Sequence, residues 1–156
     1  MPLAVLVGGF FGDEGKGKIA AYLGYVDKPA IAVRCGSINA GHTVIFNGTI
    51  WKLRIVPSFF LSKNVKLMIA AGALIRLDVL FKEIEETNVK NRIYVDRNTG
   101  VIEEKHVEIE KSDEFLVKTV GSTLQGVGAA MVDRVLRRLK VAKDVEYLKD
   151  MVTDVA

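Results

Sequence analysis

The residues best suited to chemistry lie in the glycine-rich stretch 8–18, which reads GGFFGDEGKGK. Its segment 12–18 matches the G-x-x-x-x-G-K spacing of a phosphate-binding loop, in which glycines let several backbone N–H groups approach one anion. Ile19 stands where such loops place the Ser or Thr that binds magnesium. Asp13 is the candidate ligand instead, because Mg²⁺ prefers hard oxygen donors and few protein carboxylates. The alternative interpretation is an ordinary solvated loop of glycines and charges.

A second stretch, residues 36–44 with the sequence GSINAGHTV, follows another apolar run. Asn39 offers an amide, Gly41 a closely approachable carbonyl, and His42 an imidazole that titrates near neutral pH. The local pattern leaves open whether His42 is catalytic. His106 lies in a charged, poorly patterned stretch, so we expect it on the solvated surface. Cys35 ends an apolar run and is expected to be a small buried residue.

A third small-residue stretch, residues 121–128 with the sequence GSTLQGVG, precedes an apolar pattern of helical spacing. Its hydroxyls and amides could bind a second phosphate at the start of that helix. The local pattern favours plain helix capping by Ser122 or Thr123. The basic residues that follow are expected to form a solvated helix face; they are Arg134, Arg137, Arg138 and Lys140.

Strands that alternate with helices must position these three stretches. We expect buried strands at 3–7, 30–34, 65–71 and 92–95, a hairpin at 42–56 turning at Asn47-Gly48, and helices at 18–25 (ended by Gly24), 76–87, 127–139 and 144–152. Residues 101–110 alternate too imperfectly to assign. The order predicts one α/β domain over 1–156, of the phosphate-loop type, with a mixed, largely parallel sheet, flanking helices and an antiparallel hairpin.

Composition narrows the class of protein further. The 156 residues are 49% hydrophobic and 26% charged, which is typical of a globular domain. A formal net charge of +3 is too small to argue for nucleic acid. A single cysteine excludes an internal disulfide and fits a reducing compartment. No secretory leader is visible, and Arg76 and Asp78 interrupt the most apolar run. We therefore expect a cytoplasmic protein without a membrane partner.

Four segments together are more specific than any one of them: GDEGKGK, NAGHT, NGTIWKLRIVPS and GSTLQGVGAAMVDRVLRR. Their order and spacing closely resemble adenylosuccinate synthetase, from about residue 3 to about residue 140. The resemblance implies a GTP-dependent ligase of AMP synthesis. Such an enzyme joins IMP and L-aspartate through a 6-phosphoryl-IMP intermediate, and it releases adenylosuccinate, GDP and phosphate. It also implies a cytoplasmic homodimer that requires Mg²⁺.

The resemblance assigns roles to individual residues. Asp13 matches the base that takes the N1 proton of IMP and helps to bind Mg²⁺, and His42 matches an acid acting on the transferring phosphoryl group. The backbone of Gly41 matches a metal ligand. Positions that match GTP or phosphate contacts are Gly12, Glu14, Gly15, Lys16, Gly17, Lys18 and Thr43. Positions that match IMP contacts are Asp13, Asn39, Ala40, Gly41, His42, Ser122, Thr123 and Arg137, the last reaching a partner subunit's IMP.

The sequence departs from the family pattern in several places. Family members are typically more than twice as long, and neither the guanine-recognising Asn/Thr-Lys-x-Asp element nor the aspartate-binding loop is found here. Phe10-Phe11 replaces a Gln-Trp pair, Leu124-Gln125 a Gly-Arg pair, and Ala129 a proline. Two alternatives to a synthetase therefore stay open. One is an inactive nucleotide-binding module derived from the family, and the other is an unrelated phosphate-loop protein.

Overall fold

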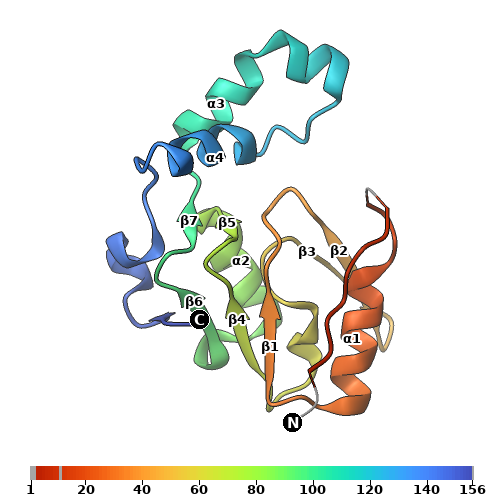
Figure 1. Ribbon diagram of the computed structural model, residues 1–156. Helices are drawn as coiled ribbons and strands as arrows, with labels where there is room; N and C mark the ends of the chain where they lie inside the picture. The colour runs from red at the N-terminus through yellow and green to blue at the C-terminus, as the bar shows by residue number, and fades with distance from the viewer. Residues whose placement is uncertain (1–2, 11, 156) are drawn as a thin grey trace.

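A parallel sheet of four strands forms the centre of the molecule (Figure 1). The computed structural model describes residues 3–10 and 12–155. The strand order is β1-β4-β6-β8, with bounds Ile31–Arg34, Lys66–Ile69, Ile93–Asp96 and Val152–Thr153. In the register Ile31 pairs with Lys66, Leu67 with Ile93, and Val95 with Val152. Three of the four strands were predicted from the sequence.

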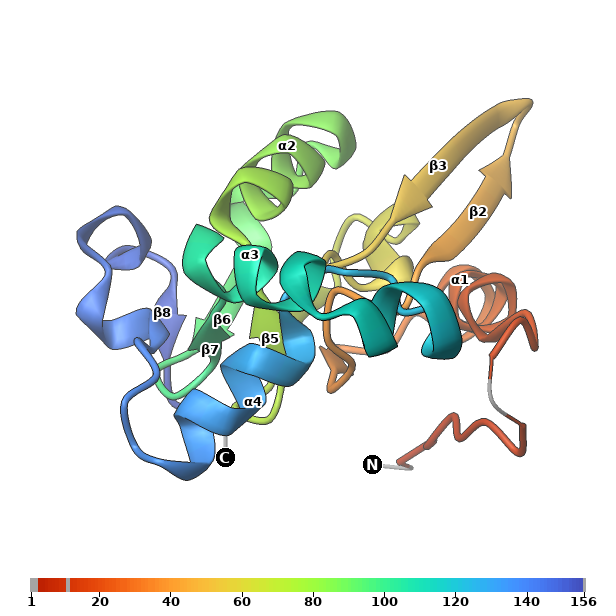
Figure 2. The same cartoon turned by 90° about the horizontal axis from the view of Figure 1, so that it is seen from above.

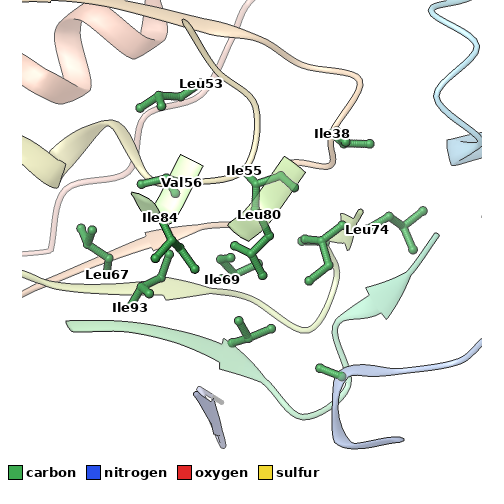
Figure 3. Packing of buried hydrophobic residues seen from close by; sticks show 14 of the residues in the cluster. Ile38, Leu53, Ile55, Val56, Leu67, Ile69, Leu74, Leu80, Ile84 and Ile93 are labelled. Carbon is green, nitrogen blue, oxygen red and sulfur yellow. The ribbon is translucent and has the colours of Figure 1, made fainter. Parts of the chain in front are cut away.

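The hydrophobic core lies on one face of this sheet. Alternate side chains point into it, such as Leu67 and Ile69 of β4. Helix α2 (Leu77–Thr87) packs Leu80 and Ile84 against them, as its predicted apolar spacing requires (Figure 3). The opposite face, which we call the open face, carries Ile31 and Val33 at 50% and 49% exposure.

The predicted hairpin is present and forms a sheet of its own. Strands β2 (His42–Phe46) and β3 (Thr49–Leu53) pair in antiparallel register around Asn47 and Gly48. Both turn residues have positive φ, 48° and 78°, as a two-residue hairpin turn of the primed kind requires. Helix α1 (Lys16–Asp27) packs beside the hairpin and the 3₁₀ turn Ser58–Leu61.

Two short parallel strands, β5 (Leu74–Ile75) and β7 (Gly100–Val101), connect the sheet to a helical end of the molecule. There α3 (Glu104–Ser112) and α4 (Val127–Val135) lie side by side, joined through a π-helical turn at Leu116–Val120 (Figures 1 and 2). Short 3₁₀ turns occupy Lys90–Arg92, Ala142–Asp144 and Glu146–Leu148. None of the described helices is long and apolar enough to cross a membrane.

The predicted strand at 3–7 is wrong in the described structure. The segment forms no ladder with β1, and Figure 2 shows it running outside the body of the molecule. Leu3, Val5 and Val7 are therefore highly exposed. An apolar run becomes a buried strand only where both a neighbouring edge and a covering layer exist, and the run alone specifies neither.

Three further helix predictions need correction, and one unassigned stretch is helical. Helix α1 continues through Gly24, where a Cβ would lie 2.8 Å from Cδ1 of Phe59, so this glycine permits close packing. The helix expected over 127–139 ends at Val135, before Arg137 adopts a positive φ of 59°. Residues 144–152 form 3₁₀ turns and part of β8, because the buried Val145 and Leu148 follow a three-residue period. The unassigned stretch 101–110 contains most of α3.

Candidate active site

The first glycine-rich loop leads directly into α1. Gly12, Asp13 and Gly15 all have positive φ, of 132°, 53° and 75°, so the chain turns sharply before Lys16. Among the described residues, no side chain caps the start of α1. Uncapped N–H groups at a helix start favour a bound anion. The exposed Asp13 stands beside this turn.

Glu14 and Lys16 pair within the loop. The Glu14 carboxylate accepts hydrogen bonds from Lys16 Nζ and from the Phe10 backbone N–H. These bonds lower the pKa of Glu14, the Lys16 contact being the larger cause. The neighbouring Phe11 lies outside the described residues. The loop therefore holds Lys16 by its own carboxylate.

Gly17 brings the first loop against the second. A Cβ on Gly17 would lie 2.6 Å from the Cβ of His42, a distance that real side chains do not tolerate. Only glycine lets the first turn of α1 approach the start of β2 so closely. The structure therefore brings together the two stretches that the sequence singled out as chemical.

A buried arginine, Arg34 at the end of β1, holds the second loop in place. One of its guanidinium nitrogens lies 3.0 Å from both ring nitrogens of His42. The other donates to the carbonyls of Ala40 at 2.9 Å and Arg54 at 2.7 Å. Ser58 Oγ lies 3.2 Å from His42 Nδ1. Sequence reasoning missed Arg34, although strand alternation places it on the buried face with Ala32.

The environment of His42 keeps its imidazole neutral. Burial is the largest cause, and the positive charges of Arg34 and Lys16 add to it, so that the pKa of His42 falls from 6.5 to about 4. At pH 7 the ring therefore has one N–H to donate and one nitrogen lone pair to accept with. Asn39, Ala40, Gly41 and Thr43 flank it on the exposed side of the same loop.

The third loop contacts the segment that follows β3 through one polar contact. Arg54 Nη1 donates to Gln125 Oε1 at 3.0 Å. Thr123 is exposed and Ser122 half-buried, and Ser122 Oγ accepts from the Leu124 N–H at 3.2 Å. The predicted IMP contacts at 122 and 123 thus lie on a loop that reaches toward residue 54. Arg137 is exposed, beyond the end of α4.

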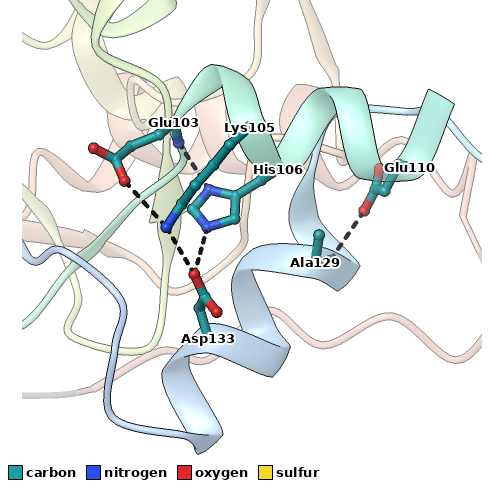
Figure 4. A network of polar contacts seen from close by, with 6 residues as sticks. All are labelled: Glu103, Lys105, His106, Glu110, Ala129 and Asp133. Atoms are coloured by element: carbon teal, nitrogen blue, oxygen red, sulfur yellow. Dashed lines mark hydrogen bonds and ion pairs between the residues drawn. The ribbon is translucent and has the colours of Figure 1, made fainter. Parts of the chain in front are cut away.

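The prediction that Ser122 or Thr123 caps α4 is wrong. The buried carboxylate of Glu110 performs this role, accepting from Gly126 N at 2.7 Å and Gly128 N at 2.6 Å (Figure 4 shows Glu110 directed at the start of α4). A carboxylate at a helix start satisfies unpaired N–H groups and favours the helix dipole. This helix start is therefore already occupied and offers no second phosphate site.

His106 is buried, with 1% exposure, and the prediction of a solvated residue is wrong. Its Nδ1 accepts from the Glu103 N–H at 2.9 Å, and its Nε2 lies 3.1 Å from Asp133 Oδ2 (Figure 4). Lys105 Nζ contacts the same carboxylate oxygen at 3.0 Å. A helical period, which the charged residues of this stretch obscured, turns His106 inward. The imidazole fastens α3 to α4 and lies apart from the two glycine-rich loops.

Two smaller expectations also fail. Cys35 is exposed, because it follows the inward-pointing Arg34. Arg134 is half-buried and donates to the carbonyls of several loop residues, including Asn98 at 2.7 Å. The exposed positions expected for the rest of the basic run are confirmed at Arg137, Arg138 and Lys140.

These features define a class of protein. A parallel α/β sheet with a glycine-rich loop at the uncapped start of a helix is the architecture of nucleotide-binding α/β proteins. The sequence profile described as adenylosuccinate synthetase matches residues 5–154. The chain belongs to the adenylosuccinate synthetase family, a family of ligases in purine biosynthesis. An unrelated phosphate-loop protein is thereby excluded.

Curated relatives are similar over the whole chain. The adenylosuccinate synthetase of Methanocaldococcus jannaschii is 49% identical over 156 residues, covering 97% of this chain and 45% of the relative. That of Methanococcus aeolicus is 46% identical over 160 residues, covering 100% of this chain and 48% of the relative. The chain therefore spans about half the length of these relatives.

Solved structures agree with the fold. Fully ligated adenylosuccinate synthetase from Plasmodium falciparum superposes with a TM-score of 0.76 and 28% identity, over 85% of this chain and 32% of that one. Succinoaminodeoxyadenylate synthetase of cyanophage S-2L, bound to dGMP and to dATP as an energy donor, superposes with a TM-score of 0.77 and 28% identity. The match covers 93% of this chain and 43% of that one. The predicted family and α/β fold are confirmed.

Proposed function

We propose that this chain carries the IMP-activating part of a GTP-dependent ligase that joins IMP to L-aspartate. The observation that carries the proposal is the contact of Gly17 with His42, which unites the uncapped start of α1 with a neutral imidazole. Membership of the family supports the same reaction. The products would be adenylosuccinate, GDP and phosphate.

The site residues suit phosphorylation of the 6-oxygen of IMP, which is otherwise a poor leaving group. Asp13 would remove the N1 proton, moving electron density onto that oxygen and making it the nucleophile. Lys16 and the loop N–H groups would offset the charge of the GTP phosphates. Neutral His42 would donate its N–H to the transferring phosphoryl group, whose negative charge would raise the pKa of the ring.

The donors near the first loop fit a magnesium ion. Asp13 supplies a carboxylate and Gly41 a carbonyl, both of them hard oxygen ligands on exposed loops. The described residues contain no cluster of three or more His, Cys, Asp or Glu that would hold a metal by themselves. Mg²⁺ usually takes one or two protein carboxylates and completes its shell with substrate phosphates and water. When bound, it would neutralise phosphate charge.

The remaining assignments belong to the same proposal. GTP phosphates would contact Gly12, Glu14, Gly15, Lys16, Gly17, Lys18 and Thr43, and IMP would contact Asp13, Asn39, Ala40, Gly41, His42, Ser122 and Thr123. Arg137, exposed beyond α4, would reach the IMP of a second subunit in a cytoplasmic homodimer. The domain would comprise residues 1–156.

A second candidate is a nucleotide-binding module of the family without ligase activity. The substitution of Leu124-Gln125 for the family's Gly-Arg pair supports it. Binding without turnover is its signature. A purine monophosphate other than IMP is a further possibility to measure, since the cyanophage neighbour binds dGMP.

The deciding experiment is calorimetric titration of the chain with IMP in the presence of Mg²⁺, with dGMP as the comparison ligand. We expect IMP to bind, and Asn39→Ala or Thr123→Ala to weaken binding, while the exposed Asn64→Ala serves as the control. A folded chain that binds no IMP would contradict the proposal. Phosphate release with GTP, IMP and aspartate then separates the enzyme from the module, and Asp13→Asn and His42→Asn should abolish it.

A further inference from the structure

We propose that Arg54 binds an oxyanion of the substrates, either the phosphate of a nucleoside monophosphate or a carboxylate of the amino acid. The inference rests on the proposed function and extends it to a residue to which no GTP, IMP or metal role was assigned above. Arg54 follows β3, in the segment that runs from the hairpin to the turn at Ser58–Leu61. Three features of this arginine carry the inference.

The first feature is a fixed backbone. The Arg54 N–H donates to Glu83 Oε1 at 2.6 Å, and the same carboxylate accepts from the N–H groups of Ile55 and Val56 at 2.9 and 2.8 Å. Glu83 is buried in α2. On the other side, the Arg54 carbonyl accepts from Arg34 at 2.7 Å. Both backbone groups of Arg54 are thus held by buried charged side chains, so its Cα position is preorganised.

The second feature is a guanidinium that has few hydrogen-bonding partners among the described residues. The Arg54 side chain is exposed, and among the described residues its single side-chain partner is the neutral amide oxygen of Gln125. No carboxylate of the described residues forms an ion pair with it. A guanidinium has five N–H donors in a planar fork that matches phosphate and carboxylate oxygens. Most of these donors therefore remain free for a ligand.

The third feature is position. The guanidinium of Arg34 binds the carbonyls of both Ala40 and Arg54, so the second glycine-rich loop and residue 54 are fastened to one group. The Arg54 side chain extends from that point to the third loop at Gln125. Arg54 therefore stands between the two loops, bound to the loop with Asn39 and His42 indirectly through Arg34 and to the loop with Thr123 through its own side chain. A substrate that contacts both loops would meet this cation.

Substitutions separate anion binding from a merely structural contact. Arg54→Gln removes the charge but can keep a hydrogen bond to residue 125. Gln125→Glu has nearly the same shape and places a carboxylate against the guanidinium, occupying it from within the protein. If Arg54 serves a ligand, both variants weaken anion binding. If it only links the loops, Gln125→Glu strengthens the link and leaves binding intact.

The experiment is calorimetric titration of the chain with IMP, with inosine, and with L-aspartate in saturating IMP. We expect Arg54→Gln and Gln125→Glu to lower the affinity for the anionic ligand on the order of 10- to 100-fold. Weaker binding of IMP with unchanged binding of inosine identifies the phosphate as the group that Arg54 binds. Weaker binding of aspartate with unchanged binding of IMP identifies the carboxylate. The control is Arg97→Gln, which removes an exposed arginine paired only at 3.7 Å with Asp154.

Two results would overturn the inference. If the parent chain binds IMP and aspartate, and both variants bind them equally well, Arg54 has no role in recognition although the proposed function stands. If the folded parent binds neither ligand, the proposed function fails and the inference fails with it. Thermal melts of each variant accompany the titrations, so that a lost fold is not read as a lost contact.

Discussion

At the scale of single residues, charge and burial decide what the second loop can do. His42 has a hydrogen-bonding partner in Ser58 and a cationic neighbour in Arg34, and its neutral form is favoured by both burial and charge. The identity of residue 42 by itself predicts an imidazole that titrates near neutral pH. Its neighbours change the protonation state without changing the residue.

This environment predicts an acid-sensitive contribution to stability. Because the folded pKa of His42 is about 4 and its ordinary value is 6.5, the unfolded chain binds the proton first as the pH falls. The stabilising contribution is complete above pH 6.5 and is lost as the pH falls toward 4. Urea unfolding at several pH values, in the parent and in His42→Asn, should show a smaller decline for the variant over this window.

Proton NMR titration provides the direct check. The chain has two histidines, and His42→Asn identifies which ring signal belongs to residue 42. A midpoint near 4 agrees with the structure. A His42 signal that titrates near 6.5 would show that the ring is neither buried nor close to the Arg34 charge in solution.

At the scale of elements, buried carboxylates satisfy backbone N–H groups, and at α4 one of them replaces the local cap that the sequence predicted. Glu83 in α2 satisfies three backbone N–H groups after β3, and Glu110 in α3 satisfies the start of α4. Each carboxylate acts on a segment well separated from it in sequence. Glu83 therefore fixes the backbone that carries Arg54, and Glu110 fixes the backbone at the end of the third loop.

Removing the Glu110 charge tests the cap on α4. Glu110→Gln leaves one oxygen to accept and turns an amide N–H toward backbone donors, so we expect a loss of about 1–3 kcal/mol in the free energy of unfolding. Hydrogen exchange of the Gly126 and Gly128 amides should accelerate. Glu108→Gln on the exposed side of the same helix is the matched control. Equal effects of the two substitutions would refute the cap.

At the scale of the whole molecule, the sheet is covered on one side. Parallel sheets usually bury both faces, but here Ile31 and Val33 on the open face of β1 are about half exposed. The segment with Leu3, Val5 and Val7 is also exposed. Apolar surface of this extent is uncommon on a soluble domain and has a measurable consequence.

The open face should bind a hydrophobic dye. We expect the folded chain to enhance 1-anilinonaphthalene-8-sulfonate fluorescence, and the pair Ile31→Thr and Val33→Thr to reduce it while the melting temperature changes little. Threonine keeps the β-branched shape that suits a strand. Ile45→Thr, an exposed position on the hairpin, is the control. Undiminished fluorescence in the double variant would place the dye site elsewhere.

Patterns of short range were sufficient for much of the fold. The Asn47-Gly48 turn, the apolar face of α2 and the strands β1, β4 and β6 were all predicted, because neighbouring residues along the chain determine each of them. The motif spacings were also sufficient to identify the family, which the profile match confirms. The roles of Asp13, His42 and the other site residues remain predictions.

What the tertiary structure decided are contacts between segments distant in sequence. The strand at 3–7 failed because an apolar run does not specify the edge it would pair with, and His106 turned inward because Asp133 of another helix binds it. Arg34 and Glu83 carried no motif, and Arg54, although it lies in the segment NGTIWKLRIVPS, was given no role of its own. Their importance arises from carbonyls, amides and an imidazole that only folding brings near them. The sequence alone determined the family and those elements that neighbouring residues specify; through-space charge and burial decided which side chains hold the site together.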